Sequence, residues 1–375
     1  MNNFTQLRFI AYRVPTVCED AGGGFLEMPM GTATAQLALD GIVNATINGI
    51  TNVDARERVA RFYLAMITAA TTLATLPDDR YTLKVFMAPE FYFRPTTANG
   101  TGGPAYNYVE YRQIKAALKV LSNEWRFRNW LIIPGTIMWT GTGAIGKRTP
   151  TPANVYFNSC QYVKVGFWST QTHVLEKEQD SQIDGLPVGP LHPGNQSQFT
   201  ALPGYYQTLA KRRKHVIEHY GTQCGVEICL EHGLELLKNV LSDGSNWRTG
   251  CLRPSRKNIS LQLLTAGGMD IDDANVAVRN NGYILRNDGY GTDTVIQPQV
   301  EIRRVTGYVV DPTVPIPVVT TYGSIPSSAQ YAAPIGVTQT VNLPGPNRTV
   351  PAPAGADLNF YFQQSLIIYN RVALP

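Results

Sequence analysis

The hydrophobic and polar positions of the chain follow two different periods. Apolar and polar side chains alternate over residues 7–12, as a half-buried strand requires. Over residues 55–74 the apolar positions recur with helical spacing, which predicts a helix with one apolar face and with Asp54 as its cap. The apolar run 82–88 then predicts a buried strand, and Glu90 follows its end.

The same succession continues further along the chain. A helix is predicted over residues 108–126 and a strand over 130–133, while the Gly-, Ala-, Thr- and Asn-rich residues 18–50 predict a long loop. Strands that alternate with helices are typical of an α/β protein, here with a strand-rich middle section. Further strands are predicted at residues 155–163, 172–175, 223–229, 260–265 and 283–285, and further helices at 209–219 and 234–241.

The composition changes toward the C-terminal end. Nine prolines lie within residues 312–353 and disfavour regular structure there. We therefore predict a globular domain over residues 1–310 and a proline-rich extension over 311–375. The apolar residues 366–369 predict that the extension ends in one more docked strand. An extended arm over the surface or over a neighbouring subunit is the alternative.

Composition and charge narrow the class of protein. Hydrophobic residues make up 43% of the chain and charged residues 16%, which is typical of a globular protein and not of a disordered one. A net charge of +4 over 375 residues does not predict nucleic-acid binding. The N-terminus lacks a basic segment followed by an apolar one, and no run approaches the roughly 18 apolar residues of a membrane span. These features predict a cytoplasmic protein with no membrane partner.

Three predicted strands each end near a residue with reactive chemistry. Glu90 and Lys177 each follow a strand, and Cys229 ends another. Catalytic residues of open α/β sheets gather beyond the carboxyl ends of strands, so the three side chains are expected to converge. The five cysteines of the chain are few and odd in number, which does not predict a disulfide framework. Taken alone, however, a cysteine on a strand is more often an inert buried thiol.

These residue types suit attack by a thiol on a carbonyl or nitrile carbon. A cysteine attacks best as the thiolate, which a nearby cation favours and which Glu90 could generate by taking the proton. Burial that raises the pKa of Glu90 toward neutrality would let it return that proton to a leaving amine. Lys177 and the backbone N–H of Leu230 could then stabilise the oxyanion.

The motifs around these residues resemble those of the nitrilase superfamily of carbon–nitrogen hydrolases. The resemblance consists of an apolar strand ending in Pro-Glu at Glu90, a lysine after a middle strand at Lys177, and Gly-x-x-Ile-Cys-x-Glu over residues 225–231. It extends over about residues 7–310. The chain also resembles the family in three supporting segments, which occur in the same order: residues 131–136, Asn158 and residues 260–266.

The resemblance implies a fold, a chemistry and an assembly. The fold is a four-layer α-β-β-α sandwich that makes residues 1–310 a carbon–nitrogen hydrolase domain, usually in homodimers or larger homo-oligomers. The chemistry is a triad of Glu90, Lys177 and Cys229 that forms a covalent thioester or thioimidate, which water hydrolyses without a metal or an organic cofactor. The leading interpretation is hydrolysis of a small linear amide, with a nitrile as the narrower alternative. A carbamoyl-group hydrolase, an amide-forming enzyme and a non-catalytic binding or scaffolding protein on this fold stay open.

The sequence departs from the family in its spacing. The gaps between the three catalytic candidates are longer than usual, which implies insertions at residues 96–105, 141–152 and 183–202. Many members also place a second glutamate between the lysine and the cysteine, for which Glu178 and Glu218 are candidates.

Further candidates for substrate binding lie close to the triad in sequence. Glu231 comes two residues after the cysteine, and Tyr92 comes two residues after the glutamate. Phe93, Trp139 and Trp168 could line a pocket together with Tyr92, although ordinary core packing explains these aromatic side chains at least as well.

Three other patterns have simpler explanations. Cys224, Cys229 and His232 lack the second ligand pair of a zinc site, so no metal is predicted. The glycine-rich residues 141–148 resemble a phosphate-binding loop, but they end in arginine where magnesium needs a hydroxyl. The basic run 211–215 is predicted to be a solvated helix face.

Overall fold

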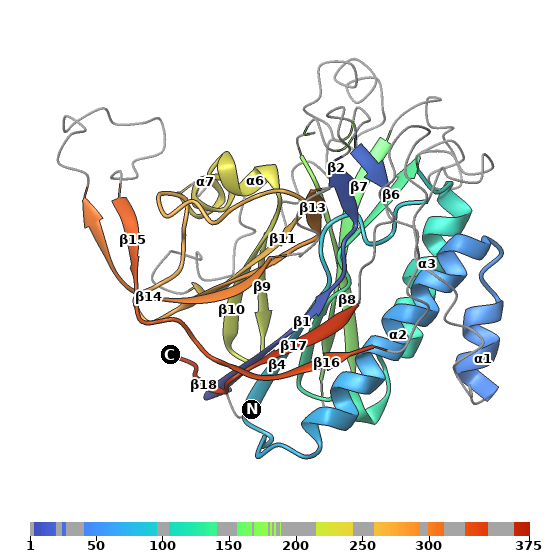
Figure 1. The fold of residues 1–375 in the computed structure, drawn as a ribbon, viewed down its shortest axis with the longest axis horizontal. Coiled ribbons are helices and arrows are strands. Elements are labelled where there is room, and N and C mark those ends of the chain that lie inside the picture. Colours follow the sequence, from blue (N-terminus) through green and yellow to red (C-terminus); the bar gives the residue numbers. More distant parts are fainter. Residues whose placement is uncertain are drawn as a thin grey trace, which may run out of the picture.

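The computed structural model contains two large β-sheets that lie face to face, with helices on their outer sides (Figure 1). The first sheet has nine strands, the second has six, and a small third sheet has three. The structure describes residues 4–19, 25–27, 41–95, 105–140, 156–166, 169–178, 181, 184, 188, 215–242, 259–292, 299–310, 327–343 and 364–375.

The first sheet is mixed. Its strands are, in spatial order, β16 (Val337–Asn342), β17 (Ser365–Tyr369), β1 (Gln6–Arg13), β4 (Thr82–Met87), β5 (Trp130–Ile133), β7 (Tyr156–Val165) and β6 (Thr136–Thr140), with β18 (Val372–Ala373) on β1 and β8 (Thr170–Glu176) on β7. Strands β1, β4 and β5 are parallel. Strand β8 runs in the same direction, because it is antiparallel to β7, which is antiparallel to β5. The carboxyl ends of β4 and β8 therefore lie at the same edge of this sheet.

The second sheet has a parallel centre. Its order is β15 (Ser327–Tyr331), β14 (Val300–Val310), β12 (Tyr283–Asp288), β11 (Ile259–Ala266), β10 (Thr222–Ile228) and β9 (Val216–His219). Strands β10, β11 and β12 are parallel, while β9 and β14 are antiparallel to their neighbours. The third sheet consists of β13 (Tyr290–Thr292), β2 (Val17–Glu19) and β3 (Phe25–Glu27).

The helices lie outside the two large sheets. Helices α2 and α3 run along the first sheet, and α6 and α7 lie over the second (Figure 1). Their bounds are α1 (Gly41–Asn48), α2 (Val53–Leu73), α3 (Tyr108–Leu121), the 3-10 turn η2 (Trp125–Phe127), α6 (Leu230–Gly233) and α7 (Leu236–Ser242).

The alternation of side chains along the strands divides the core into layers. Phe9 of β1 and Leu263 of β11 belong to the apolar cluster between the two sheets. Ile10, the next residue of β1, packs with α2 and α3 on the outer face of the first sheet. Leu264, the next residue of β11, packs on the outer face of the second sheet with Val276. The predicted α/β class and the four-layer α-β-β-α sandwich are confirmed.

The start of α2 differs from the prediction. Asn52 caps the helix, since its side chain accepts a hydrogen bond from the N–H of Ala55 at 3.0 Å. Asp54, the predicted cap, lies inside the first turn and pairs with Arg58 one turn later at 2.8 Å. An acidic side chain in the first turn also suits the positive end of the helix dipole.

Three other predicted elements need correction. The helix over 108–126 ends at Leu121, because the Ser and Asn residues that follow favour a turn over a helix interior. The helix over 209–219 is wrong for Val216–His219, which pair antiparallel with β10 as β9; the β-branched Val216 and Ile217 suit a strand. The loop over 18–50 contains α1. Residues 209–214 lie outside the described part of the chain.

The C-terminal segment belongs to both large sheets. Strand β15 pairs with β14 in the second sheet, and β17 pairs antiparallel with β1 in the first. Residues 366–369, predicted to dock as a strand, lie in β17. The division of the chain at residue 310 stays a prediction.

Candidate active site

Three strand ends meet between the two sheets. Glu90 follows β4 after a short turn, Lys177 directly follows β8, and Cys229 directly follows β10. Their exposed fractions are 0%, 1% and 2%, respectively. The Glu90 carboxylate lies close enough to the thiol of Cys229 to raise its pKa. The three predicted catalytic residues are therefore brought together, two from the first sheet and one from the second.

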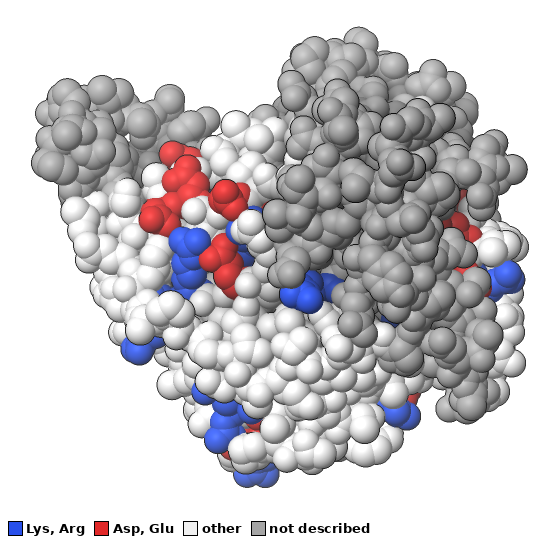
Figure 2. Space-filling view, in the orientation of Figure 1, with Lys and Arg blue, Asp and Glu red and all other residues white. Residues whose placement is uncertain are grey.

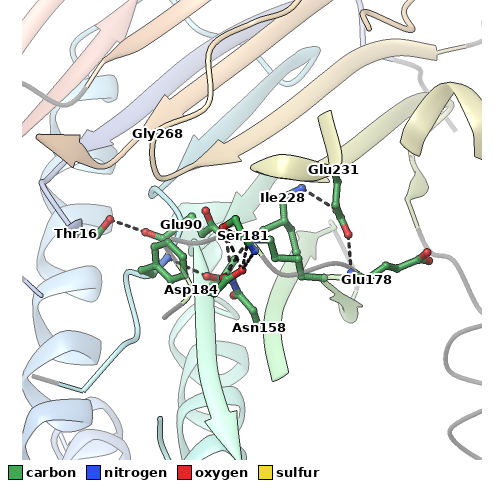
Figure 3. A network of polar contacts seen from close by, with 12 residues as sticks. Thr16, Glu90, Asn158, Glu178, Ser181, Asp184, Ile228, Glu231 and Gly268 are labelled. Carbon is green, nitrogen blue, oxygen red and sulfur yellow. Dashed lines mark hydrogen bonds and ion pairs between the residues drawn. The ribbon is translucent and has the colours of Figure 1, made fainter. Parts of the chain in front are cut away.

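Lys177 is the centre of a buried ionic cluster. Its Nζ donates to Oε1 of Glu90 at 2.8 Å and to both carboxylate oxygens of Asp184 at 3.0 Å. The side-chain amide of Asn158 donates to the same Glu90 oxygen at 2.9 Å and to Asp184 at 3.1 Å. Figure 3 shows Asn158, Ser181 and Asp184 gathered around Glu90. The Lys177 ammonium group thus contacts two carboxylates, and the Asn158 amide donates a hydrogen bond to each of them.

Burial sets the charge states of this cluster. It raises the pKa of Glu90 to about 6; the charge of Lys177 opposes this rise, and Asp184 adds to it. For Lys177, burial favours the neutral amine, but Glu90 and Asp184 outweigh that effect and raise the pKa of the lysine. Glu90 can therefore gain and lose a proton near neutral pH beside a side chain that stays charged.

Cys229 has a backbone conformation that side-chain-bearing residues rarely adopt. Its φ is 47° and its ψ is −111°, and its N–H donates to the backbone oxygen of Thr265 at 2.9 Å. Burial and the Glu90 carboxylate raise the pKa of the thiol well above its usual value, against the opposing charge of Lys177. The expected stabilisation of a thiolate by the cation is therefore outweighed.

Glu231 links the segments that carry the lysine and the cysteine. One carboxylate oxygen accepts the N–H of Glu178, beside Lys177, at 2.9 Å, and the other accepts the N–H of Ile228, beside Cys229, at 2.9 Å (Figure 3). Burial raises the pKa of Glu231 to about 7. Glu231 was predicted to bind substrate, but both of its oxygens are engaged by the backbone.

The second carboxylate beside Lys177 is Asp184, and not one of the predicted glutamates. Glu218 is exposed on β9, and the Glu178 carboxylate lies 3.8 Å from Nε2 of the buried His215. Asp184 escaped prediction because it lies within the stretch 183–202, which was assigned to an insertion. The signal that could have revealed it is a carboxylate seven positions after the lysine, since a buried cation requires compensating charge.

The predicted pocket aromatics lie elsewhere. The hydroxyl of Tyr92 donates to the backbone oxygen of Arg58 in α2 at 3.0 Å. Tyr92, Phe93 and Trp139 all belong to the core between the first sheet and its helices, so core packing explains them. Trp168 lies outside the described residues.

Other candidate sites have structural roles where they are described. His232 pairs through its ring with Glu227, and Cys224 packs in the core between the sheets. Among the described residues, no group of three or more His, Cys, Asp or Glu side chains could hold a metal ion. His215, the last residue of the basic run, is buried and does not lie on a solvated helix face.

Two further sequence predictions concern loops and membrane spans. Residues 141–148 and 211–214 lie outside the described part, as do the predicted insertions except for Ala105, Asp184 and Val188. In the described part, no helix combines the length and the apolar character needed to cross a membrane.

Comparison with known proteins gives distant structural similarities. No protein-family model matches the sequence, and no curated protein matches it either. An amidase from Nesterenkonia sp. has a TM-score of 0.38 at 8% identity, covering 80% of this chain and 84% of that one. The E-to-L variant of the Nesterenkonia sp. AN1 amidase with an acetamide moiety on its active-site cysteine has a TM-score of 0.40 at 11% identity, covering 99% and 91%. Nit3 of Saccharomyces cerevisiae, a branch 10 member of the nitrilase superfamily, has a TM-score of 0.38 at 10% identity, covering 80% and 83%.

These structural likenesses are to the superfamily that the sequence motifs resemble. At such low identities and TM-scores the similarity does not bear on the reaction, and the chemistry of this chain has to be inferred from its own residues.

Proposed function

We propose that this protein hydrolyses a non-peptide carbon–nitrogen bond in a small linear amide or a nitrile, with Cys229 as the nucleophile. The observation that carries the proposal is the convergence of a thiol, a carboxylate and a charged amine from three strand ends in a buried site. A buried ion pair beside a buried thiol is costly to maintain for stability alone, and perturbed pKa values are typical of catalytic groups.

The proposed first half of the reaction acylates the cysteine. The Glu90 carboxylate takes the thiol proton while Sγ of Cys229 attacks the amide carbon. Nζ of Lys177 and the N–H of Leu230 stabilise the resulting oxyanion. Glu90 then gives the proton to the leaving amine, the carbon–nitrogen bond breaks, and a thioester remains on Cys229.

The proposed second half regenerates the thiol. Glu90, again a carboxylate, takes a proton from water as the water oxygen attacks the thioester carbon. The carbon–sulfur bond breaks, the proton returns to the sulfur, and a carboxylic acid leaves. For a nitrile, the first adduct would be a thioimidate, which water converts by the same groups.

Asp184 moderates the effect of Lys177 on the Glu90 carboxyl group, as this cycle requires. Without it, a single lysine beside Glu90 would hold the pKa of that carboxyl group low, and Glu90 would be a poor proton donor to the leaving amine. Burial raises the pKa of Glu90 to about 6 against the charge of Lys177, and Asp184, which shares the ammonium group, adds to that rise. Asp184 therefore allows one carboxyl group to act as base and as acid in turn.

The proposed substrate is a small molecule, and the reaction uses no cofactor. A homodimer or a larger homo-oligomer and a cytoplasmic location stay predictions from the sequence, as does the absence of nucleic-acid and membrane partners.

The test is release of ammonia or amine from a panel of linear amides and nitriles by purified protein. We expect turnover of at least one substrate, and Cys229→Ala should lower it by a factor of about 10⁴ or more, the scale seen when a covalent nucleophile is removed. Cys224→Ala is the matched control, because Cys224 is buried on the same strand and faces the core between the sheets. Turnover that survives Cys229→Ala would overturn the proposal, and so would a complete lack of turnover across the panel.

A further inference from the structure

A second buried polar network lies on the opposite face of β10 from the core between the sheets. Val226 and Ile228 point into that core, so the intervening Glu227 points to the outer face. Gln262 of the neighbouring β11 points the same way, since Leu261 and Leu263 face inward. The side chains of Glu227, Gln262 and His232 of α6 are all 0% exposed.

Every polar side-chain atom of this network has a hydrogen-bond partner. Oε2 of Glu227 accepts from Nδ1 of His232 at 2.8 Å and from Nε2 of Gln262 at 2.6 Å, and its Oε1 accepts from the N–H of Leu237 at 2.9 Å. Oε1 of Gln262 accepts from the N–H of Ala277 at 2.8 Å. Nε2 of His232 accepts from the N–H of Asp272 at 3.1 Å. Because a backbone N–H can only donate, the imidazole is neutral and carries its proton on Nδ1.

A carboxylate buried at this depth is expensive unless each oxygen is hydrogen-bonded. Apolar side chains would fill the same layer at a lower cost, as Leu264 and Val276 do nearby. The network therefore fixes something that apolar packing would leave loose: the position of α6 relative to β10 and β11.

The residue fixed in this way is the cysteine. A non-glycine residue at positive φ is strained and persists only where the surroundings over-determine it. The N–H of Cys229 is held by Thr265 of β11, and its backbone oxygen accepts the N–H of His232 at 2.9 Å. His232 therefore holds the cysteine with its backbone while its ring is held by Glu227.

We propose that Glu227, His232 and Gln262 are positioning residues, which hold α6 so that Cys229 keeps its strained backbone and directs its thiol at Glu90. The inference rests on the proposed function of Cys229 as a nucleophile. None of the three side chains contacts the triad, so they act through the turn that carries the cysteine.

The test exchanges the charge between two neighbouring strands. Glu227→Gln places an amide where two side-chain donors and one backbone donor need an acceptor, and Gln262→Glu places two carboxylates together. The double variant Glu227→Gln/Gln262→Glu restores an acceptor for each donor, because Nδ1 of His232 already lies 3.2 Å from the side-chain nitrogen of Gln262. His232→Asn is a milder variant that keeps a donor to Glu227 and loses the acceptor for Asp272.

The readout is the rate at which limiting iodoacetamide alkylates each cysteine of the native protein, followed by peptide mapping at neutral pH. Cys160 and Cys224 are the internal references, because both are buried in the core between the sheets. We expect each single variant to slow Cys229 labelling by about 10-fold, the double variant to recover to within about 3-fold of wild type, and His232→Asn to lie in between. The two references should stay protected throughout.

Each outcome decides between a positioning role and a general role in stability. Wild-type labelling of Cys229 in both single variants would overturn the inference, as would a double variant as slow as the singles. Faster labelling of Cys160 and Cys224 together in the singles would show general loosening of the fold and would also overturn it. Wild-type Cys229 that labels no faster than Cys224 would instead overturn the proposed function, and this inference with it.

Discussion

The two large sheets form two walls of the candidate site, and each wall contributes a different property. The wall from the first sheet carries charge: Glu90, Lys177 and Asp184 compensate one another over distances of 2.8–3.0 Å. The wall from the second sheet carries Cys229, whose backbone is strained and whose support is a network of hydrogen bonds around Glu227 on the far face of the sheet. One wall supplies the electrostatics of the reaction, and the other supplies its geometry.

This difference predicts how each wall responds to substitution. Removing one charge from the first wall leaves another charge buried and uncompensated, so stability and rate should fall together. Changing a support of the second wall should mainly lower the rate, because the cysteine loses its direction while the core between the sheets stays packed. On the surface, Figure 2 shows one patch where acidic and basic side chains lie side by side, and separate basic side chains elsewhere on the same face.

The largest effect is expected for the base of the first wall. Glu90→Gln should lower kcat by about 10²–10⁴-fold, since the variant cannot take the thiol proton. In the wild type, kcat/KM should fall as the pH drops through about 6, because Glu90 acts as a base only when ionised. The variant should lose this acid limb.

The control for Glu90 is a half-buried carboxyl group of the same sheet. Burial raises the pKa of Glu176 to about 7, and its partner is Ser159. Glu176→Gln should retain the acid limb. If it removes the limb while Glu90→Gln keeps it, the assignment of the base is wrong.

Removal of the cation should affect both rate and stability. Lys177→Met leaves two buried carboxylates without a compensating cation, which should cost about 3–5 kcal/mol of unfolding free energy. Loss of an oxyanion donor should lower kcat by about 10²–10³-fold. The stability loss should shrink as the pH falls, because protonated carboxyl groups no longer need the cation; urea unfolding at several pH values measures this.

A matched lysine separates these effects from general loss of charge. Lys164 on β7 is half-buried and donates to the backbone oxygen of Glu218. Lys164→Met should change stability by less than about 1 kcal/mol and leave kcat unchanged. Equal effects of the two substitutions would contradict a special role for Lys177.

The link between the walls should have a smaller effect. In Glu231→Gln, one amide nitrogen faces a backbone N–H and leaves it without an acceptor, at a cost of about 1–3 kcal/mol. We expect kcat to fall by about 10-fold as Lys177 and Cys229 lose their shared anchor. Glu178→Gln, which keeps the backbone N–H bound by Glu231, should lower kcat much less. A larger fall in kcat for Glu178→Gln than for Glu231→Gln would show that Glu231 does not link the two walls.

The smallest effect is expected from added volume beside the base. In Gly267→Ala, the new Cβ would lie 3.2 Å from Oε2 of Glu90 and 3.0 Å from the ring of Phe91, so both must shift slightly. A shift of a few tenths of an ångström should lower kcat/KM by about 3–10-fold. In Gly233→Ala on the second wall, the nearest atom is 3.4 Å away, in ordinary contact, and kcat/KM should stay near the wild-type value.

The parts that the sequence predicts well are those with a strong local signal. Strand β4 and its Pro-Glu end, and strand β10 with its cysteine, stand out because buried parallel strands are short apolar runs with a fixed exit. The convergence of Glu90 and Lys177 follows from the common direction of β4 and β8. The four-layer arrangement came from the resemblance of these motifs and not from the pattern alone.

The parts that it misses depend on contacts distant in sequence. Asp184 has no local motif, and only its ion pair with Lys177 reveals its role. Strand β9 is only four residues long and is defined by its pairing with β10, which a local pattern does not show. Glu231 was recognised as important but for another role, because sequence does not show which backbone groups a carboxylate will meet.

The most direct test of the central claim is to find the acyl group on the cysteine during turnover. The wild-type protein would be mixed with an excess of an amide that it hydrolyses, quenched in acid, digested and analysed by mass spectrometry. We predict the mass of the substrate's acyl group on the peptide that contains Cys229, and its absence in Glu90→Gln. An acyl group on any other residue, or hydrolysis at the wild-type rate by Cys229→Ala, would contradict the account.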